Sequence, residues 1–340
     1  TYEAGLEMAF LKNRLSFDLT YYYSLSKDQI TQAQISSTTG YVTASINAGS
    51  IRNKGIELVL GGTPIQTKNF TWDASLNFSA NRNKVMSLKE GLTEIIYGAA
   101  TGGYINSPVQ FKLIPGEPYG NIYGSYYLRS YGTSVEDPNR TDKSKPLLIG
   151  ANGFPISSLT RRKLLGNSQP DWIGGLSNNF TYKRLSLSTL IDARWGFEKF
   201  NRLENFNSAF GIADYTANRR SYYTFPGNLA DGTPNTKQVW LGQAVGPDGV
   251  NYGEGYYRLY HRSLSEPFVQ DASWIRLRTA SLSYSLPSKW LPKKAIRNAS
   301  VAFTGNNLFL RTDYYGLDPE SLSADSGSNV DGSAGMTYPA

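Results

Sequence analysis

The segment from Phe70 to Asn81, FTWDASLNFSAN, alternates between two kinds of side chain at every position. Aromatic residues, leucine and alanine occupy one set of positions, and small polar residues with a single aspartate occupy the other. A period of two predicts a β-strand whose two faces meet different environments. Strands of globular proteins are usually about five or six residues long, whereas a tilted strand that crosses a bilayer needs roughly nine to eleven. This longer segment therefore fits a membrane-crossing strand.

The same alternation recurs along the chain and predicts about ten long strands. One predicted hairpin turns at Lys12 and Asn13, and a later one turns at Lys183 and Arg184. The predicted strands cover residues 1–10, 14–23, 53–63, 70–81, 104–114, 119–132, 172–182, 185–195, 271–287 and 299–310. Near Thr279 the apolar phase of its strand slips, which predicts a β-bulge.

The connections between these strands alternate between short and long. Short turns are expected at Lys12, at 63–69, at 115–118, at Lys183 and at 287–298, with long loops between them. Outer-membrane barrels combine short periplasmic turns with longer extracellular loops. The predicted fold class is therefore all-β, an antiparallel transmembrane β-barrel, with residues 1–340 forming part of one barrel domain.

Tryptophan positions favour the same interpretation, because indole prefers the headgroup layer of a membrane. The predicted girdles consist of Trp172, Trp195 and Trp274 at the long-loop ends of strands and Trp72 and Trp290 at or beside the short-turn ends.

Composition does not exclude a barrel. Hydrophobic residues make up 40% of the chain and the mean hydropathy is −0.39, but alternation averages apolar and polar positions within each strand. No apolar run approaches the roughly 18 residues that a spanning helix requires. The alternative is a soluble β-sandwich, whose apolar faces would pack on a second sheet. A sandwich explains neither the strand length nor the loop asymmetry.

Charge and cysteine content narrow the function classes. The net charge is +7, and we expect the lysines and arginines to be scattered over turns and loops. No basic cluster interleaved with aromatic residues indicates a nucleic-acid partner. The absence of cysteine excludes disulfides and thiolate metal sites.

Few residues suggest bond chemistry, and neither an enzyme nor a cofactor is predicted. The only histidine, His261, precedes a strand and is interpreted as a solvated loop residue. Residues 325–335, DSGSNVDGSAG, resemble a calcium loop only loosely because the closing glutamate is missing. Asp318 and Glu320 are interpreted as a turn or hydrogen-bond cap.

The remaining role to consider for individual residues is the binding of a transported substrate. Candidate substrate-lining residues near the outer strand ends are Asn81, Arg82, Asp192 and Arg194, and those in the long loop are Tyr222, Tyr223, Trp240, Tyr256 and Tyr257. Aromatic faces beside amides and charged groups suit sugars or peptides. The alternative is that these residues only pack the loops or anchor the girdle.

Several segments resemble the SusC/RagA family of TonB-dependent outer-membrane transporters. The resemblance lies in the hairpin 53–88, in the Pro-Asp/Gly-Gly hairpin 165–201, and in 271–287, 305–309 and 315–320. The family has 22 strands. The resemblance implies the second half of such a barrel without its last strand, since the chain opens in strand rhythm and stops at a Tyr-Pro pair followed by Ala340.

The resemblance also implies a function: active import of glycan oligosaccharides or peptides across the bacterial outer membrane. The implied partners are a SusD-like surface lipoprotein, the TonB–ExbB–ExbD complex acting through an N-terminal part, the plug and remaining barrel half, and outer-membrane lipid. The alternatives are a siderophore or cobalamin TonB-dependent receptor and a passive porin or structural β-domain.

Overall fold

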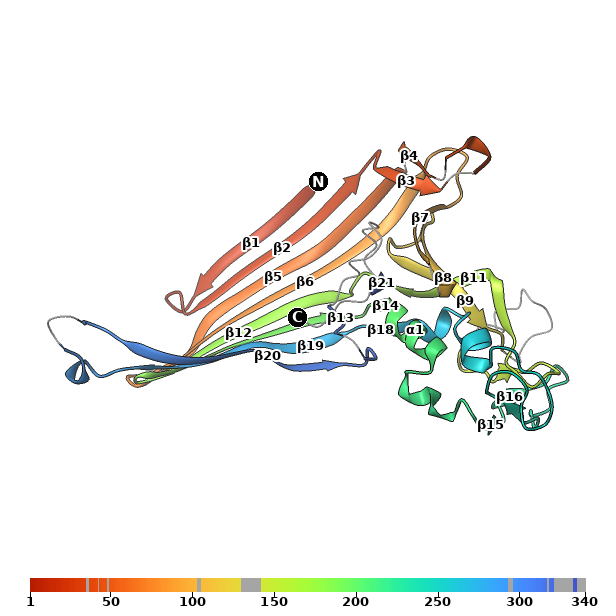
Figure 1. Cartoon of the computed structure of the whole chain (residues 1–340). Helices are drawn as coiled ribbons and strands as arrows, with labels where there is room; N and C mark the ends of the chain where they lie inside the picture. Colours follow the sequence, from red (N-terminus) through yellow and green to blue (C-terminus); the bar gives the residue numbers. More distant parts are fainter. Residues whose placement is uncertain are drawn as a thin grey trace.

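The computed structural model describes residues 1–34, 37–41, 43–47, 49–102, 105–129, 142–292, 296–316, 318–320 and 333–334. One eight-stranded antiparallel sheet dominates these residues, with the strand order β1-β2-β5-β6-β12-β13-β19-β20 (Figure 1). Its strands are β1 (Tyr2–Phe10), β2 (Leu15–Ser26), β5 (Gly49–Gln66), β6 (Phe70–Leu88), β12 (Trp172–Tyr182), β13 (Leu185–Trp195), β19 (Trp274–Ser285) and β20 (Ser300–Thr312). Neighbouring strands in this order are antiparallel and lie in the order of the sequence, as in the wall of a barrel.

This sheet has an apolar face and a polar face. The apolar face carries residues such as Leu76, Leu187 and Leu282, and the polar face carries residues such as Ser75 and Ser281. Leu76, in the middle of β6, is 36% exposed, so no second layer of protein covers it. An uncovered apolar face of this extent is unsuited to water. The structure therefore excludes the sandwich alternative.

Tight turns join the strands at one end of the sheet. Lys12 and Asn13 have φ values of 59° and 64°, and Lys183 has φ of 55°. Left-handed turn residues match the right-handed twist of the paired strands. The long connections, which include residues 89–171 and 196–273, gather at the opposite end (Figure 1). The predicted asymmetry of turns and loops is confirmed, except that the predicted short turn at 115–118 lies within the long connection 89–171.

The strand count requires a correction from about ten to eight in this sheet. The predicted strands 104–114 and 119–132 are β8 (Ile105–Leu113) and β9 (Asn121–Tyr127), which belong to a separate sheet in the order β11-β9-β8-β7. Its other members are β7 (Ile95–Gly102) and β11 (Ser157–Asn167). Residues on both faces of β9 are buried, so this strand packs inside protein and has no face for lipid.

The described residues of the connections 89–171 and 196–273 fold together into what we call the loop body. One of its apolar clusters joins Phe111 and Ile122 of the small sheet to Phe200 and Phe268, and a second surrounds Phe154. The short elements of the loop body are α1 (Arg202–Phe210), β10 (Leu147–Leu148), β14 (Glu198–Asn201), β15 (Tyr222–Tyr223), β16 (Gly227–Asn228), β17 (Val239–Trp240) and β18 (Val269–Asp271). Three further short strands lie outside the loop body: β3 (Ile30–Gln34), β4 (Thr43–Asn47) and β21 (Ser333–Ala334). Within the described residues, no helix has the length and apolarity needed to cross a membrane.

Candidate functional site

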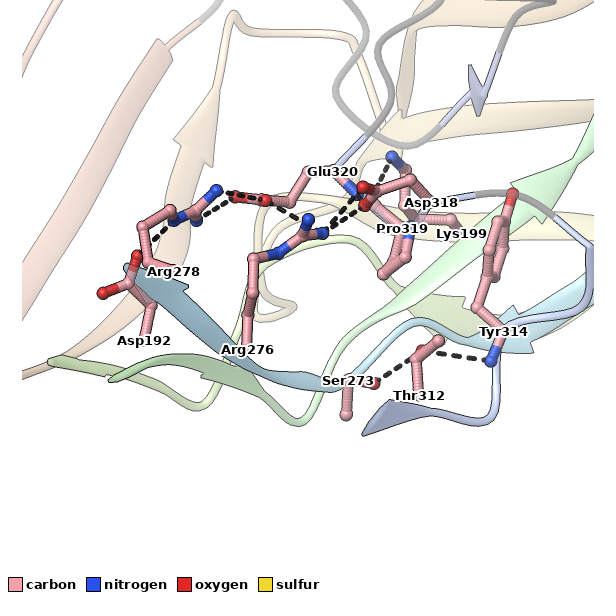
Figure 2. A network of polar contacts seen from close by, with 10 residues as sticks. All are labelled: Asp192, Lys199, Ser273, Arg276, Arg278, Thr312, Tyr314, Asp318, Pro319 and Glu320. Carbon is pink, nitrogen blue, oxygen red and sulfur yellow. Dashed lines mark hydrogen bonds and ion pairs between the residues drawn. The ribbon is translucent and has the colours of Figure 1, made fainter. Parts of the chain in front are cut away.

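A network of charged side chains lies on the polar face of the sheet, at the end that meets the loop body (Figure 2). Arg276 of β19 donates to the two carboxylate oxygens of Asp318 at 2.6 and 2.7 Å. Arg278 binds Glu320 with two hydrogen bonds of 2.9 Å and Asp192 of β13 with one of 2.7 Å. We call these five residues the ion-pair network. Bidentate arginine–carboxylate pairs of this kind fix geometry as well as charge.

The predicted bulge in β19 is confirmed and helps to build this network. Ile191 pairs with Leu277 and Leu190 pairs with Thr279, so Arg278 is the extra residue. Both Arg276 and Arg278 lie against the Trp274 ring, at 5.5 and 5.6 Å from its centroid. Trp274 is only 5% exposed and is buried against Phe197 and Tyr314 on the polar face. It therefore does not face lipid, which corrects its assignment to a girdle.

The network holds the segment after β20 against the sheet. Thr312 accepts from the Tyr314 N–H at 3.1 Å and donates to the Ser273 carbonyl at 2.9 Å, which starts the return of the chain (Figure 2). Lys199 Nζ then donates to the Pro319 carbonyl at 2.8 Å. The predicted turn cap is present, since the Glu320 N–H donates to Asp318 at 2.9 Å.

The protonation of Asp318 follows from its partners. Partial burial acts to raise its pKa, but hydrogen bonds from Arg276 and the Glu320 N–H, together with the charges of Arg276 and Arg278, lower the pKa below its ordinary value. The ionised form is therefore the one that the network stabilises, and its acidic members do more than cap a turn.

Asp192 and Arg194 are confined by protein contacts. Asp192 accepts from Arg278, and the Arg194 guanidinium stacks on the Phe197 ring at 4.5 Å from its centroid. Both charged groups therefore have partners within the protein, Asp192 on the neighbouring strand and Arg194 at the start of the loop body.

Asn81 and Arg82 point to opposite faces of the sheet, because neighbouring residues in a strand alternate. Asn81 lies on the polar face, where it donates to Asn53 and accepts from the Tyr22 hydroxyl, both at 3.1 Å. Arg82 lies on the apolar face beyond its aromatic residues and pairs with Asp171 at 2.8 Å. The expectation that Arg82 lines the lumen is therefore wrong.

Tyr256 is a core residue of the loop body. It is 7% exposed and lies against Phe154 and Phe225, with ring centroids 6.1 and 4.6 Å away. Its hydroxyl is 3.1 Å from that of Tyr127. Burial raises the pKa of Tyr256 well above its ordinary value. Tyr256 therefore stabilises the loop body, which corrects its assignment as a substrate-lining residue.

His261 is also enclosed, which corrects its interpretation as a solvated residue. Four aromatic rings surround it, with centroids between 5.1 and 5.9 Å away: those of Tyr215, Tyr256, Tyr257 and Phe268. Burial lowers the pKa of His261 to about 4, so the neutral imidazole is present at neutral pH. No group of metal-binding residues occurs in the part of the chain that the structure describes, and residues 325–335 lie outside it except for 333–334.

A pocket of about 660 Å³ opens in the loop body, and we call it the loop pocket. Two of the candidate residues, Trp240 and Tyr257, line it. Tyr222 packs edge-on against Trp240 with centroids 5.2 Å apart, and exposed Tyr223 lies outside the lining. Of the five aromatic candidates in the long loop, two therefore line the pocket and three do not.

The lining of the loop pocket also contains basic residues that the sequence pattern did not single out. Arg219, Arg220 and Arg258 line it together with one carboxylate, that of Glu254. Arg258 is occupied, at 3.6 Å from Glu254 and 5.6 Å from the Phe210 ring. Arg220 is exposed and has no ion pair among the described residues. In the sequence, the adjacent arginines at 219–220 were the available signal of a basic site. A pocket lined by arginines suits a substrate with anionic groups.

The remaining predicted girdle residues fall at two levels of the apolar face. Trp172 stacks on Trp195 and Phe78, with centroids 6.3 and 5.9 Å away. Trp72 stacks on Phe180 at 5.6 Å. Along β12 the two levels are about 26 Å apart, at roughly 3.3 Å per residue. Trp290 lies in the last short turn and is exposed.

A one-layer antiparallel sheet with an apolar face, a polar face and its loops at one end is the wall of a membrane β-barrel. The structure of the RagAB peptide transporter shares this fold, with a TM-score of 0.62, 21% identity, and coverage of 93% of this chain and 32% of that one. The RagAB importer in an open-open state gives a TM-score of 0.60 over 93% of this chain and 31% of that one.

Curated relatives agree with the fold, although no protein-family model matches the chain. TonB-dependent receptor P3 of Formosa agariphila is 26% identical over 325 residues, covering 94% of this chain and 30% of the receptor. TonB-dependent receptor SusC of Bacteroides thetaiotaomicron is 26% identical over 332 residues, covering 95% of this chain and 29% of SusC. The resemblance to the SusC/RagA family is thereby confirmed, and the chain spans about 30% of the length of these relatives.

Proposed function

We propose that this chain is part of the barrel of a SusC-like transporter that imports large nutrients, glycan oligosaccharides or peptides, across the bacterial outer membrane. The observation that carries the proposal is the one-layer sheet, whose apolar face is uncovered while its polar face meets a folded loop body at one end. Such a wall separates lipid from an aqueous path and performs no bond chemistry.

The loop pocket is the proposed point of first contact with the nutrient. Trp240 and Tyr257 offer flat apolar surfaces, and Arg220 offers an unpaired cation among the described residues. These groups suit a polar polymer that carries carboxylates or other anions. The ion-pair network holds residues 318–320 against the polar face of the wall, near the end where the loop body lies.

Partners and energy are proposed from the named relatives. A SusD-like lipoprotein would cover the loop body, and TonB would act through a part of the full-length protein outside this chain. A siderophore or cobalamin receptor would share the wall. A passive porin is the alternative that differs in mechanism, because it needs no energy source.

Uptake by the full-length transporter in its host tests this proposal. We expect uptake to stop when TonB is deleted, and the double substitution Arg220→Ala and Trp240→Ala to weaken nutrient binding about tenfold, the loss of one charged contact and one aromatic surface. Tyr223→Ala is the matched control, since Tyr223 is exposed but lies outside the pocket. Uptake that continues without TonB would instead identify a passive pore.

A further inference from the structure

Four basic residues form a patch on the apolar face, beyond its aromatic residues. Arg52 and Lys54 lie on β5, and Arg82 and Lys84 lie on β6. All four share the face of Ile56 and Ala80, because each is separated from these residues by an even number of positions without an intervening bulge. We call these four residues the basic patch.

The pairing of the two strands sets like charges against each other. Lys54 lies directly opposite Arg82, and Arg52 lies directly opposite Lys84. Side chains that face each other across an antiparallel pair have Cβ atoms about 5 Å apart, and like charges there are destabilising. The pairing of the strands does not itself require basic residues at these four positions.

Protein groups neutralise only a small part of this charge. Asp171 pairs with Arg82 at 2.8 Å, and within the described residues Arg52, Lys54 and Lys84 form no ion pair. The Nε of Arg52 is also buried and has no hydrogen-bond partner in that part of the chain. The neighbouring groups in register on β2 are Tyr23 and Leu25, which carry no negative charge. An external anion would remove the repulsion.

The height of the patch identifies the source of that anion. Trp72 marks the short-turn level of the apolar face, and Arg82 lies ten positions further along β6. Ten residues span about 33 Å along a strand, and a tilt of 35–45° reduces this to roughly 25 Å, the height of the apolar band of outer-membrane barrels. Lys54 and Arg82 therefore lie at the edge of the hydrocarbon, and Arg52 and Lys84 lie one row beyond it.

We propose that the basic patch binds the phosphate groups of an anionic glycolipid in the outer leaflet of the membrane. The acyl chains of this lipid would lie on the apolar face below the patch, beside Ile56 and Ala80, and its phosphates would bridge β5 and β6. Arginine and lysine bind phosphate with strong, charge-assisted hydrogen bonds. The inference rests on the membrane placement in the proposed function, but it concerns a lipid site and not the nutrient path.

The test uses the purified full-length transporter in neutral detergent, with lipid A and dephosphorylated lipid A as probes. We expect the double variant Lys54→Gln and Lys84→Gln to bind lipid A about tenfold more weakly, as the loss of two charge-assisted contacts implies, and to bind the dephosphorylated form unchanged. The matched control, Lys12→Gln with Lys183→Gln, removes two lysines from the short turns at the other end of the sheet and should leave binding unchanged.

The outcomes separate this inference from the proposed function. Equal binding of both lipid forms by the unmodified transporter, or equal loss in the control variant, would overturn the lipid site while nutrient uptake continues. Inorganic phosphate that binds the patch as tightly as lipid A would identify a free anion as the ligand and also overturn it. Failure of nutrient uptake with intact lipid A binding would reject the proposed function alone.

Discussion

Aromatic side chains are arranged in opposite ways in the sheet and in the loop body. On the apolar face of the sheet, Trp72 and Trp172 stack on neighbours within the layer and remain uncovered from outside. In the loop body, Phe111 and Phe154 are buried within clusters. Aromatic side chains are therefore uncovered by protein in one region and enclosed by it in the other, and the two regions should respond differently to substitution.

The largest expected effect is in the loop body. Phe111→Ala removes a fully buried ring from the cluster that joins the small sheet to Phe200 and Phe268, and we expect a loss of about 3–5 kcal/mol in the stability of this region. Limited proteolysis of the full-length protein measures this loss, and only the loop body should become sensitive. Sensitivity that spreads along the sheet would show that the two regions are one cooperative unit.

A charge in the middle of the apolar face should have the next largest effect. Leu76→Arg places a cation where we propose hydrocarbon, at a cost of about 2–4 kcal/mol. Ser75→Arg is the matched control, because this exposed neighbour points to the polar face and its arginine stays in water. Urea unfolding of the protein in lipid vesicles compares the two. Equal losses would contradict the placement of lipid on one face only.

The attachment of the segment after β20 to the sheet should respond less strongly. Arg276→Met removes the buried cation from Asp318 and Glu320, whose carboxylates are partly exposed and regain water, so we expect a loss of about 1–3 kcal/mol. The readout is cleavage of residues 313–320 by protease, with Arg311→Met as a control on the neighbouring strand. No change in cleavage would show that the network does not hold this segment.

The smallest effect is a dependence on pH within the loop body. The pKa of His261 falls from an ordinary value near 6.5 to about 4, so the unfolded region binds a proton more readily than the folded one. Its contribution to stability is complete above pH 6.5 and is lost as the pH falls from 6.5 towards 4. Proteolysis of the loop body at pH 7 and pH 5 measures this loss of stability. We expect faster cleavage at pH 5, and His261→Gln should reduce the difference between the two pH values.

Much of the sheet was predictable because alternation reports directly on two unlike faces. The hairpin turns, the bulge near Thr279 and most of the long strands follow from local pattern alone. The pattern placed β8 and β9 in the barrel wall, which is wrong, because a short apolar stretch has the same sequence pattern whether it faces lipid or a protein core. Trp274 was misassigned although alternation with Ile275 already places it on the polar face; only its cover by Phe197 and Tyr314 needed the tertiary structure.

The functional residues were less predictable because they come from separated segments. Asp192 and Arg278 are far apart in sequence, and the pairing of β13 with β19 brings them within 2.7 Å. The loop pocket draws its arginines from 219–220 and from 258, which the fold of the loop body brings together. The pairs Arg52/Lys54 and Arg82/Lys84 are visible in the sequence, but they become one patch only when β5 and β6 pair in register.

The sequence by itself determined the antiparallel wall, since a period of two over long segments requires strands with unlike faces. Tertiary structure decided which segments leave the wall, which tyrosine and histidine side chains are buried, and where the charges gather. The physical reason is range: alternation is written in neighbouring residues, whereas burial and charge clustering depend on contacts between residues that are distant along the chain.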